Sequence, residues 1–288
     1  MVGGPALILI TSEFLMAASL NRSAFFDAVR EKPFGGRLSQ GQVDGMNAIL
    51  DACPPDLSTD RLAYCLATPV VETARTMQPI KEYGGAAYFR RMYDIQGERP
   101  AKARELGNLQ PGDGALFCGR GYVQLTGRSN YRKATAQLRA LGYITAADDL
   151  ERTPDLAMRP DVAAAVLFVG MQKGWFTGRK LADYFGPGKA DAVGARRIIN
   201  GQDRAAEIAA DWGAMRTALM QARHTPGAVT KAVPVPPVEV QPLPPASLQP
   251  MAPNAGRPPV PAGPVPRPTT PASRSLFGRI LDRLTGTA

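Results

Sequence analysis

GRGYVQLTGRSNY, residues 119–131, is the stretch of this sequence that says most about the fold, because it combines three glycines with closely spaced polar side chains. Upstream of it, VVETARTMQPIKE places two carboxylates, Glu72 and Glu82, ten positions apart. Hydrolysis of a glycosidic bond needs two carboxyl groups in different environments and a polar cleft that holds a sugar. The two stretches together therefore predict a carboxylate-based glycosidase.

The rest of the sequence excludes most other hydrolytic chemistry. The chain has a single histidine, His224, so a zinc site of the HExxH type is excluded, and no GxSxG elbow accompanies it. Cys53, Cys65 and Cys118 form no CxxC pair, and no GxxxxGK[ST] phosphate loop is present. We therefore expect no metal and no cofactor, and acid–base chemistry carried by carboxylates.

The three cysteines are an odd number, which argues against a disulfide framework. Buried free thiols are the favoured interpretation, since free cysteine behaves as a small hydrophobic residue. A Cys53–Cys65 bridge stays open as the alternative.

Length and composition indicate a globular chain with a basic surface. At 288 residues and 44% hydrophobic, it can bury a full core, and its formal charge is +9. Such a charge favours contact with an anionic polymer, such as a bacterial wall or a nucleic acid. Because there is no RNP-like aromatic motif and no dense basic helix, no nucleic-acid partner is expected. The expected partner is a polysaccharide substrate, bound by a monomer.

The sequence divides into four segments. Residues 1–20 are an apolar leader, or the start is mis-assigned and translation begins at Met16. Residues 21–224 are the globular part. Residues 225–272 contain 16 prolines, which predicts a disordered but semi-rigid linker. Residues 273–288 have apolar side chains at helical spacing with arginines between them, so this short helix is expected to lie on a membrane surface or to dock on a partner.

Periodicity predicts that residues 21–224 are mostly helical. In the segment 38–50, Ser39 and Gln42 occupy capping-box positions. In 60–77, Pro69 interrupts the pattern, and Thr68 is expected to cap a new helical start. The glycine-rich stretch 83–130 is expected to be irregular. The other expected helices are 23–29, 161–171, 191–200 and 203–220.

The two carboxylates are expected to differ in environment. Glu72 follows apolar residues in a helix, so burial should raise its pKa, as suits a general acid. Glu82 lies between Pro79 and the Tyr83-Gly84-Gly85 segment, which predicts a loop or strand edge. We expect more solvent there, which would keep Glu82 ionised and able to activate a water molecule.

The motif order resembles that of the glycoside hydrolases of family 19, in the branch of bacterial and phage chitinase-like enzymes and endolysins. The resemblance spans about residues 21–220, and its most specific piece is GRGYVQLTGRSNY. It implies a lysozyme-like, mainly α-helical fold with two lobes and a central cleft. The segments that carry it are ETARTMQPIKE, GDGALFCGRGYVQLTGRSNY, TPDL, FTGRKLADYF and ARRIINGQD.

The resemblance also implies roles for individual residues. Glu72 matches the family's general acid and Glu82 its general base, in a mechanism that inverts the anomeric configuration. Thr126 matches the residue that helps to hold the attacking water. Substrate contacts are implied for Gln124, Asn130 and Asn200. Tyr122 is a further candidate, which would stack on a sugar ring or else pack in the core, and the same two readings apply to Tyr131.

Other residues of the motifs have structural interpretations. Gly119, Gly121 and Gly127 are expected to serve backbone geometry and close approach of a sugar. Arg120 is expected to pair structurally, with electrostatic support of the base as the alternative. The sequence departs from the family at Val71, where the usual motif has a histidine before the acid. An apolar neighbour would raise the pKa of Glu72 further.

Three functions remain open at this point. The first is an endolysin that cleaves the β-1,4 linkages of peptidoglycan, made in the cytoplasm, released through a holin and acting in the periplasm or outside the cell. The second is a chitinase with the same mechanism. The third is a catalytically impaired glycan-binding protein, which Val71 keeps open. The short segment between Glu72 and Glu82 favours the first, since plant-type chitinases carry a longer insertion there.

Overall fold

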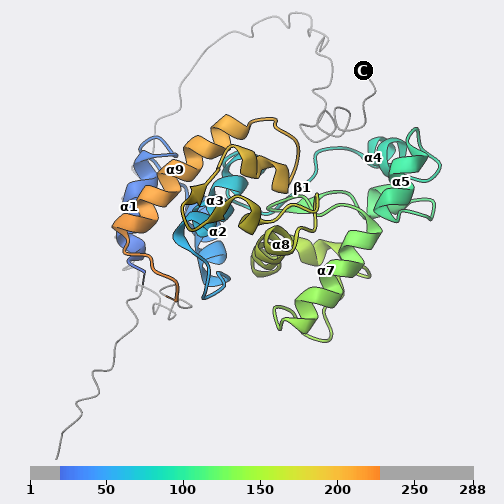
Figure 1. The fold of residues 1–288 in the computed structure, drawn as a ribbon. Helices are drawn as coiled ribbons and strands as arrows, with labels where there is room; N and C mark the ends of the chain where they lie inside the picture. Colours follow the sequence, from blue (N-terminus) through green and yellow to red (C-terminus); the bar gives the residue numbers. More distant parts are fainter. Residues whose placement is uncertain (1–19, 228–288) are drawn as a thin grey trace, which may run out of the picture. The chain divides into compact units, whose positions relative to one another are not determined.

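The structure is a computed structural model that describes residues 20–227. The expected leader, proline-rich linker and terminal helix therefore lie outside the described residues, apart from Leu20 and the first residues of the linker. The described chain is mainly α-helical, as expected (Figure 1). Its α-helices are α1 (Arg22–Glu31), α2 (Gln40–Asp51), α3 (Thr59–Glu72), α4 (Ala86–Tyr93), α5 (Pro100–Leu106), α6 (Asp113–Leu116), α7 (Arg128–Ala140), α8 (Pro160–Lys173) and α9 (Ala205–Gln221).

Short strands and 3₁₀ turns connect these helices. Strand β1 (Ile80–Lys81) pairs antiparallel with β2 (Arg120–Gly121), so that Ile80 faces Gly121. Strands β3 (Phe185–Gly186) and β4 (Lys189–Ala190) form a second small pair. The 3₁₀ turns are η1 (Pro154–Met158), η2 (Leu181–Asp183) and η3 (Gly194–Ile198). No helix within residues 20–227 has the length and hydropathy needed to cross a membrane.

The start of α2 confirms the predicted capping box. The Ser39 hydroxyl accepts from the Gln42 amide at 3.2 Å, and the Gln42 side chain accepts from the Ser39 amide at 2.8 Å. These bonds satisfy two backbone donors that have no partner inside the helix. Gln42 also donates to the Arg75 carbonyl at 2.8 Å, which ties α2 to the turn that follows α3.

Helix α3 is continuous, so the predicted break at Thr68 and Pro69 is wrong. Pro69 lies inside the helix, and the Thr68 hydroxyl donates to the Tyr64 carbonyl one turn back, at 2.9 Å. All residues from Leu62 to Glu72 are buried. Proline inside a helix costs about 3 kcal/mol, and burial of this helix on every side outweighs that cost.

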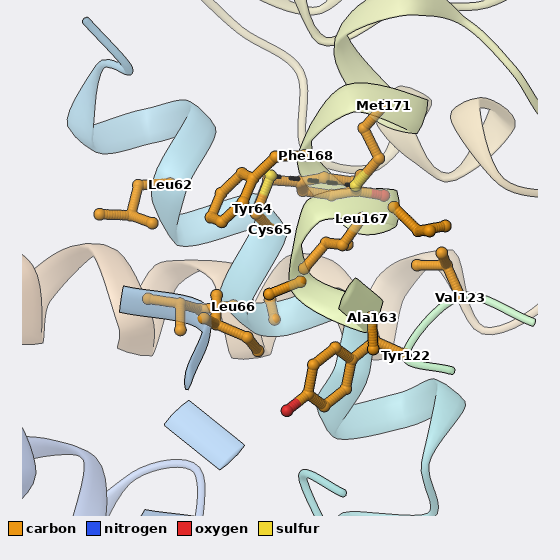
Figure 2. Packing of buried hydrophobic residues seen from close by; sticks show 14 of the residues in the cluster. Leu62, Tyr64, Cys65, Leu66, Tyr122, Val123, Ala163, Leu167, Phe168 and Met171 are labelled. Carbon is orange, nitrogen blue, oxygen red and sulfur yellow. Dashed lines mark hydrogen bonds between the residues drawn. The ribbon is translucent and has the colours of Figure 1, made fainter. Parts of the chain in front are cut away.

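The main core forms where α3 meets α8 and α9. Helices α1 and α9 come from opposite ends of the described chain and lie side by side (Figure 1), joined by a bond from the Asn21 amide to the Ala222 carbonyl at 3.0 Å. Helix α8 is buried from Val162 to Met171. Figure 2 shows residues of α3 and α8 packing together with Tyr122 and Val123 from the GRGYVQLTGRSNY segment.

The cysteines are free thiols, so the alternative of a Cys53–Cys65 bridge is wrong. Cys65 and Cys118 are buried and Cys53 is half-buried, as the favoured interpretation required. The Cys65 thiol lies 3.9 Å from the Met171 sulfur in the core (Figure 2). Burial raises the pKa of both Cys53 and Cys65, which keeps these thiols protonated and unreactive.

The stretch 83–130 is more ordered than expected, since it contains α4, α5, α6 and β2. Pro100 opens α5, and Gly107, with φ of 71°, closes it. The helices are short, and tertiary packing holds them. Side chains of α4 and α5, together with Cys118, form a second cluster of buried residues, separate from the main core. Its members are Phe89, Met92, Tyr93, Leu106 and Cys118. The central cleft of the expected two-lobed fold stays a prediction.

Two predicted helices are shorter in the structure. The helix expected over 60–77 ends at Glu72, because Ala74, Arg75 and Met77 all have positive φ. In the segment 191–200, only Gly194–Ile198 is helical, as the 3₁₀ turn η3. The predicted helix 203–220 matches α9 closely, with Ile208, Met215 and Leu219 buried on its inner face.

Among the described glycines, Gly45 leaves the least room for an added methyl group, and we expect Gly45→Ala to destabilise the protein. A methyl group there would lie 1.7 Å from the Met77 carbonyl oxygen, so the turn after α3 would have to move. Overpacking of this kind costs about 1–3 kcal/mol, measurable by urea unfolding. Gly213→Ala in α9 is the matched control, since nothing lies within 4 Å of its added methyl group, and it should be neutral or stabilising by up to about 1 kcal/mol. Equal effects of the two changes would contradict this packing.

Candidate active site

Glu82 lies directly after β1, at the strand edge that the sequence predicted. The Tyr93 hydroxyl donates to its Oε1 at 2.8 Å, and the Gly119 amide donates to its Oε2 at 3.1 Å. The Glu82 amide in turn donates to the Gly119 carbonyl at 2.8 Å. The pairing of β1 with β2 therefore holds this carboxylate against the start of the GRGYVQLTGRSNY segment.

The expectation that Glu82 is well solvated is wrong, since the residue is only 6% exposed. The reason is α4, which formed in a stretch predicted to be irregular and brings Tyr93 against the carboxylate. Burial raises the pKa of Glu82, and the bonds from Tyr93 and Gly119 pull this pKa back down. The hydrogen bonds, and not solvent, are what stabilise the ionised form here.

Gly119 brings three of the predicted site residues together. A methyl group added at Gly119 would lie 2.7 Å from Gln124 Oε1 and 3.2 Å from both Glu82 Oε2 and Thr126 Oγ1. These three oxygens, from the end of β1 and from the turn after β2, therefore surround one small space that only a glycine leaves free. Two of these oxygens belong to Glu82 and Thr126, the residues predicted to hold the attacking water.

A tight turn places Gln124 and Thr126. Arg120 and Leu125 exchange backbone hydrogen bonds at 2.9 and 3.2 Å, while Gly121 and Gln124 adopt positive φ. The side-chain nitrogen of Gln124, Nε2, donates to the Ile80 carbonyl at 3.0 Å, and this bond connects the turn to β1. The Thr126 hydroxyl donates to the Gln124 carbonyl at 2.9 Å and leaves its oxygen free to accept.

Asn130 supports this turn from the first residues of α7. Its amide nitrogen donates to the Thr126 carbonyl at 2.7 Å, and its side chain is half-buried. Gly127 has φ of 91° at the junction between the turn and α7, a conformation that glycine adopts readily. Asn130 therefore lies against Thr126, and its predicted contact with a sugar stays a prediction.

Glu72 is the last residue of α3 and is 5% exposed. Its Oε1 accepts a hydrogen bond from Nη1 of Arg196, which is itself buried, while its Oε2 is shielded from solvent and has no hydrogen-bond partner. Burial raises the pKa of Glu72, and the positive charge of Arg196 opposes that rise. The predicted rise in the pKa of Glu72 is thus confirmed, while its role as a general acid stays a prediction.

Arg196 is anchored from a second direction. Its Nε donates to the Asp203 carbonyl at 2.9 Å, whereas its Nη2 is buried without a partner. Asn200 lies one turn further along, where its amide donates to the Arg196 carbonyl at 3.0 Å and its Oδ1 accepts from the Gly201 amide at 2.8 Å. The structure therefore places Asn200 next to Arg196, the residue that binds Glu72, and its predicted contact with substrate stays a prediction.

Tyr122 was predicted to contact substrate or to pack in the core, and the structure shows core packing. Its ring is fully buried in the main core, and its hydroxyl donates to the Gly45 carbonyl at 3.3 Å. Tyr131 is buried in the same way. Arg120 has the expected structural role. Its guanidinium donates to Asp155 at 2.7 Å and to the Tyr131 hydroxyl at 3.0 Å. Core packing is therefore the role that the structure gives to both tyrosines.

Tyr93 and Arg196 are site residues that sequence reasoning missed. Arg196 lies inside the motif ARRIINGQD, where the buried pattern of the helical turn could have pointed to an inward arginine. Tyr93 had no comparable signal, because its stretch was predicted to be irregular. In both cases a residue from another element supplies the hydrogen bond that tunes a carboxylate, 11 positions away for Tyr93 and 124 for Arg196.

Comparison with known proteins leaves the family open. No family model matches the sequence, and no curated protein does. Among solved structures, chitinase C from Streptomyces griseus HUT6037 and a mutant of chitinase C each align at 19% identity with a TM-score of 0.43. Each alignment covers 72% of this chain and 78% of the other. This identity is too low to assign an activity.

Gly119→Ala tests the space between Glu82 and Thr126 directly. The added methyl group would block access to both oxygens, and we expect glycan hydrolysis to fall by about 10²-fold. The fold should survive, because Gly119 does not have positive φ and the nearest atom is the end of the flexible Gln124 side chain. Gly186→Ala, which meets nothing within 4 Å, is the control. Full activity of Gly119→Ala in a reducing-end assay would contradict this assignment.

Proposed function

We propose that this protein is a glycoside hydrolase that cleaves β-1,4 linkages of bacterial peptidoglycan by an inverting mechanism. The observation that carries the proposal is the pair of buried carboxyl groups with raised pKa and unlike partners. Glu72 has an arginine on one oxygen and nothing on the other. Glu82 has two neutral donors, one on each oxygen.

Glu72 suits the general acid. Because Arg196 occupies Oε1, the carboxyl proton has its place on Oε2, the oxygen without a partner. From there it passes to the glycosidic oxygen as the bond to the anomeric carbon breaks. Since Oε2 is shielded from solvent, substrate binding must open a path to it.

Glu82 suits the general base. Its ionised form keeps the hydrogen bonds from Tyr93 and Gly119, and its Oε2 lies beside Thr126 at the Gly119 space. A water molecule held between Glu82 and Thr126 would attack the anomeric carbon while Glu82 takes its proton. Attack from the face opposite to the leaving group inverts the anomeric configuration.

Two features favour peptidoglycan over chitin as the substrate. The net charge of +9 suits an anionic wall, and the segment between Glu72 and Glu82 is short.

On this proposal the protein acts on the cell wall, in the periplasm or outside the cell. A chitinase is the alternative, and a glycan-binding protein without activity is the alternative of another class, motivated by Val71 beside the acid.

The test uses purified peptidoglycan and soluble chitin with the wild-type protein and Glu82→Gln. We expect wild type to release reducing ends from peptidoglycan and to clear a wall suspension, and Glu82→Gln to do neither. Release from chitin alone would replace the proposed substrate by the alternative one. Binding of both glycans by both proteins without any cleavage would refute the enzyme proposal.

A further inference from the structure

A hollow of about 730 Å³ lies outside the proposed catalytic residues, at the end of α4. Helix α4 supplies Arg90 and Arg91, and the loops that follow supply the other walls. The lining includes Arg90, Arg91, Asp94, Gln96, Glu98 and Gly112.

The walls of this hollow, called here the α4 pocket, are held in place by Asp94. This residue is buried, and its Oδ2 accepts from the amides of Gly112 at 2.6 Å and Gly114 at 3.3 Å. On the other side, the Glu98 amide donates to the Arg91 carbonyl at 2.8 Å. Backbone donors therefore occupy the carboxylate of Asp94. These hydrogen bonds fix the positions of the pocket walls.

The charges around the α4 pocket leave one cation unpaired. Arg91 lies 3.8 Å from Glu98 and over the ring of Tyr88. The exposed guanidinium of Arg90, by contrast, makes no hydrogen bond or ion pair with any residue between 20 and 227. A guanidinium is a planar fork of donors that matches a carboxylate. The chemistry of the pocket therefore fits a ligand that carries a carboxylate.

The α4 pocket also lies close to the proposed base. Tyr93, the neighbour of Asp94 in sequence, extends from the end of α4 to Glu82, with 2.8 Å between its hydroxyl and Oε1. Asp94 in the pocket wall and Glu82, the proposed base, are thus connected through a single residue, Tyr93. An extended peptide of five residues spans about 17 Å, which is longer than a tyrosine side chain, so its length is sufficient for a peptide attached to a sugar bound at Glu82.

We propose that the α4 pocket binds the acidic peptide stem of peptidoglycan, with Arg90 on one of its free carboxylates. The inference rests on the proposed function and names what would distinguish its substrate from chitin. Both glycans have β-1,4-linked amino sugars, but only peptidoglycan carries peptides with free carboxylates. Arg90 would act in substrate specificity, and it takes no part in the chemical step.

The test compares intact peptidoglycan with the same glycan after an amidase has removed its stems. For wild type we expect a KM about tenfold lower on the intact glycan, since a hydrogen bond between charged groups is lost with the stem. Arg90→Gln should raise KM on the intact glycan to the value for the stripped one, with kcat unchanged, and Arg90→Lys should fall between. Arg37→Gln, an exposed arginine ahead of α2, is the control and should match wild type.

The outcomes separate the pocket from the catalytic proposal. If wild type cleaves glycan but Arg90→Gln has the wild-type KM on both forms, the pocket inference is overturned and the hydrolase proposal stands. If wild type cleaves no glycan, the hydrolase proposal fails, and calorimetry with the free tripeptide alanyl-γ-D-glutamyl-diaminopimelate decides the pocket. Binding at least tenfold tighter to wild type than to Arg90→Gln would support it, whereas equal or absent binding would overturn it.

Discussion

Replacing Glu72 by glutamine lowers kcat for glycan hydrolysis by about 10²–10⁴-fold, the usual contribution of a positioned acid. Glutamine keeps an oxygen that accepts from Arg196, so the change removes the proton and preserves the shape of the site. Glu151→Gln is a suitable control, because this carboxylate pairs with Arg128 and Arg132 and takes no part in the proposed mechanism. It should remain within a factor of about two of wild type. Equal losses in both variants would show a general effect of charge removal.

The same pair of carboxylates sets the pH profile. On the proposed mechanism, activity requires Glu82 ionised and Glu72 protonated, so it is lost as pH falls through the pKa of Glu82 and as pH rises through that of Glu72. Burial raises both from their ordinary value of 4.5. We therefore expect a bell-shaped plot of kcat/KM against pH, with its acidic limb above pH 4.5. The two apparent values belong to the coupled pair.

Arg196→Met destabilises the protein by about 3–5 kcal/mol near neutral pH, since it leaves a buried carboxylate without its counter-charge. The arginine and Glu72 are both almost fully buried, so solvent cannot replace the lost partner. The variant also loses the bond to the Asp203 carbonyl. Chemical unfolding at about pH 7 measures the loss. Arg30→Met, which breaks an exposed pair with Asp27, is the matched control and should cost less than about 1 kcal/mol.

The pH dependence of this loss has a definite sign. Without Arg196, the folded-state pKa of Glu72 rises further above its unfolded value, so the folded state binds the proton more tightly. Stability from that proton is present at low pH and is lost as pH rises through the folded pKa. The difference between wild type and Arg196→Met should therefore shrink between about pH 7 and about pH 5. A difference independent of pH would mean that Glu72 and Arg196 are not coupled.

Sequence reasoning located most of the candidate site because its residues lie in short, dense motifs. Gln124 and Thr126 belong to one turn, Asn130 supports that turn from the start of α7, and Gly119 joins the turn to Glu82. The mainly helical fold followed in the same way from periodic apolar residues in long segments such as α8 and α9. Local patterns of this kind are visible before any tertiary contact forms.

What escaped prediction depends on tertiary packing. Helix α4 is short, and the second hydrophobic cluster stabilises it, so neither its helicity nor the burial of Glu82 by Tyr93 was visible locally. Pro69 in α3 shows the same override of a local preference by burial on all sides. Tyr122 was ambiguous from sequence, because an aromatic ring in a motif can serve a ligand or the core, and its contact with Gly45 spans 77 positions.

The most direct test of the two-carboxylate account is the anomeric configuration of the first product. A β-1,4-linked oligosaccharide prepared from peptidoglycan would be incubated with wild type and followed by proton NMR from the first minutes. On the proposed mechanism, water held by Glu82 and Thr126 attacks opposite to the bond that Glu72 protonates, so the new reducing end should appear first as the α-anomer. Initial appearance of the β-anomer would contradict the assignment of Glu82 as a base acting through water.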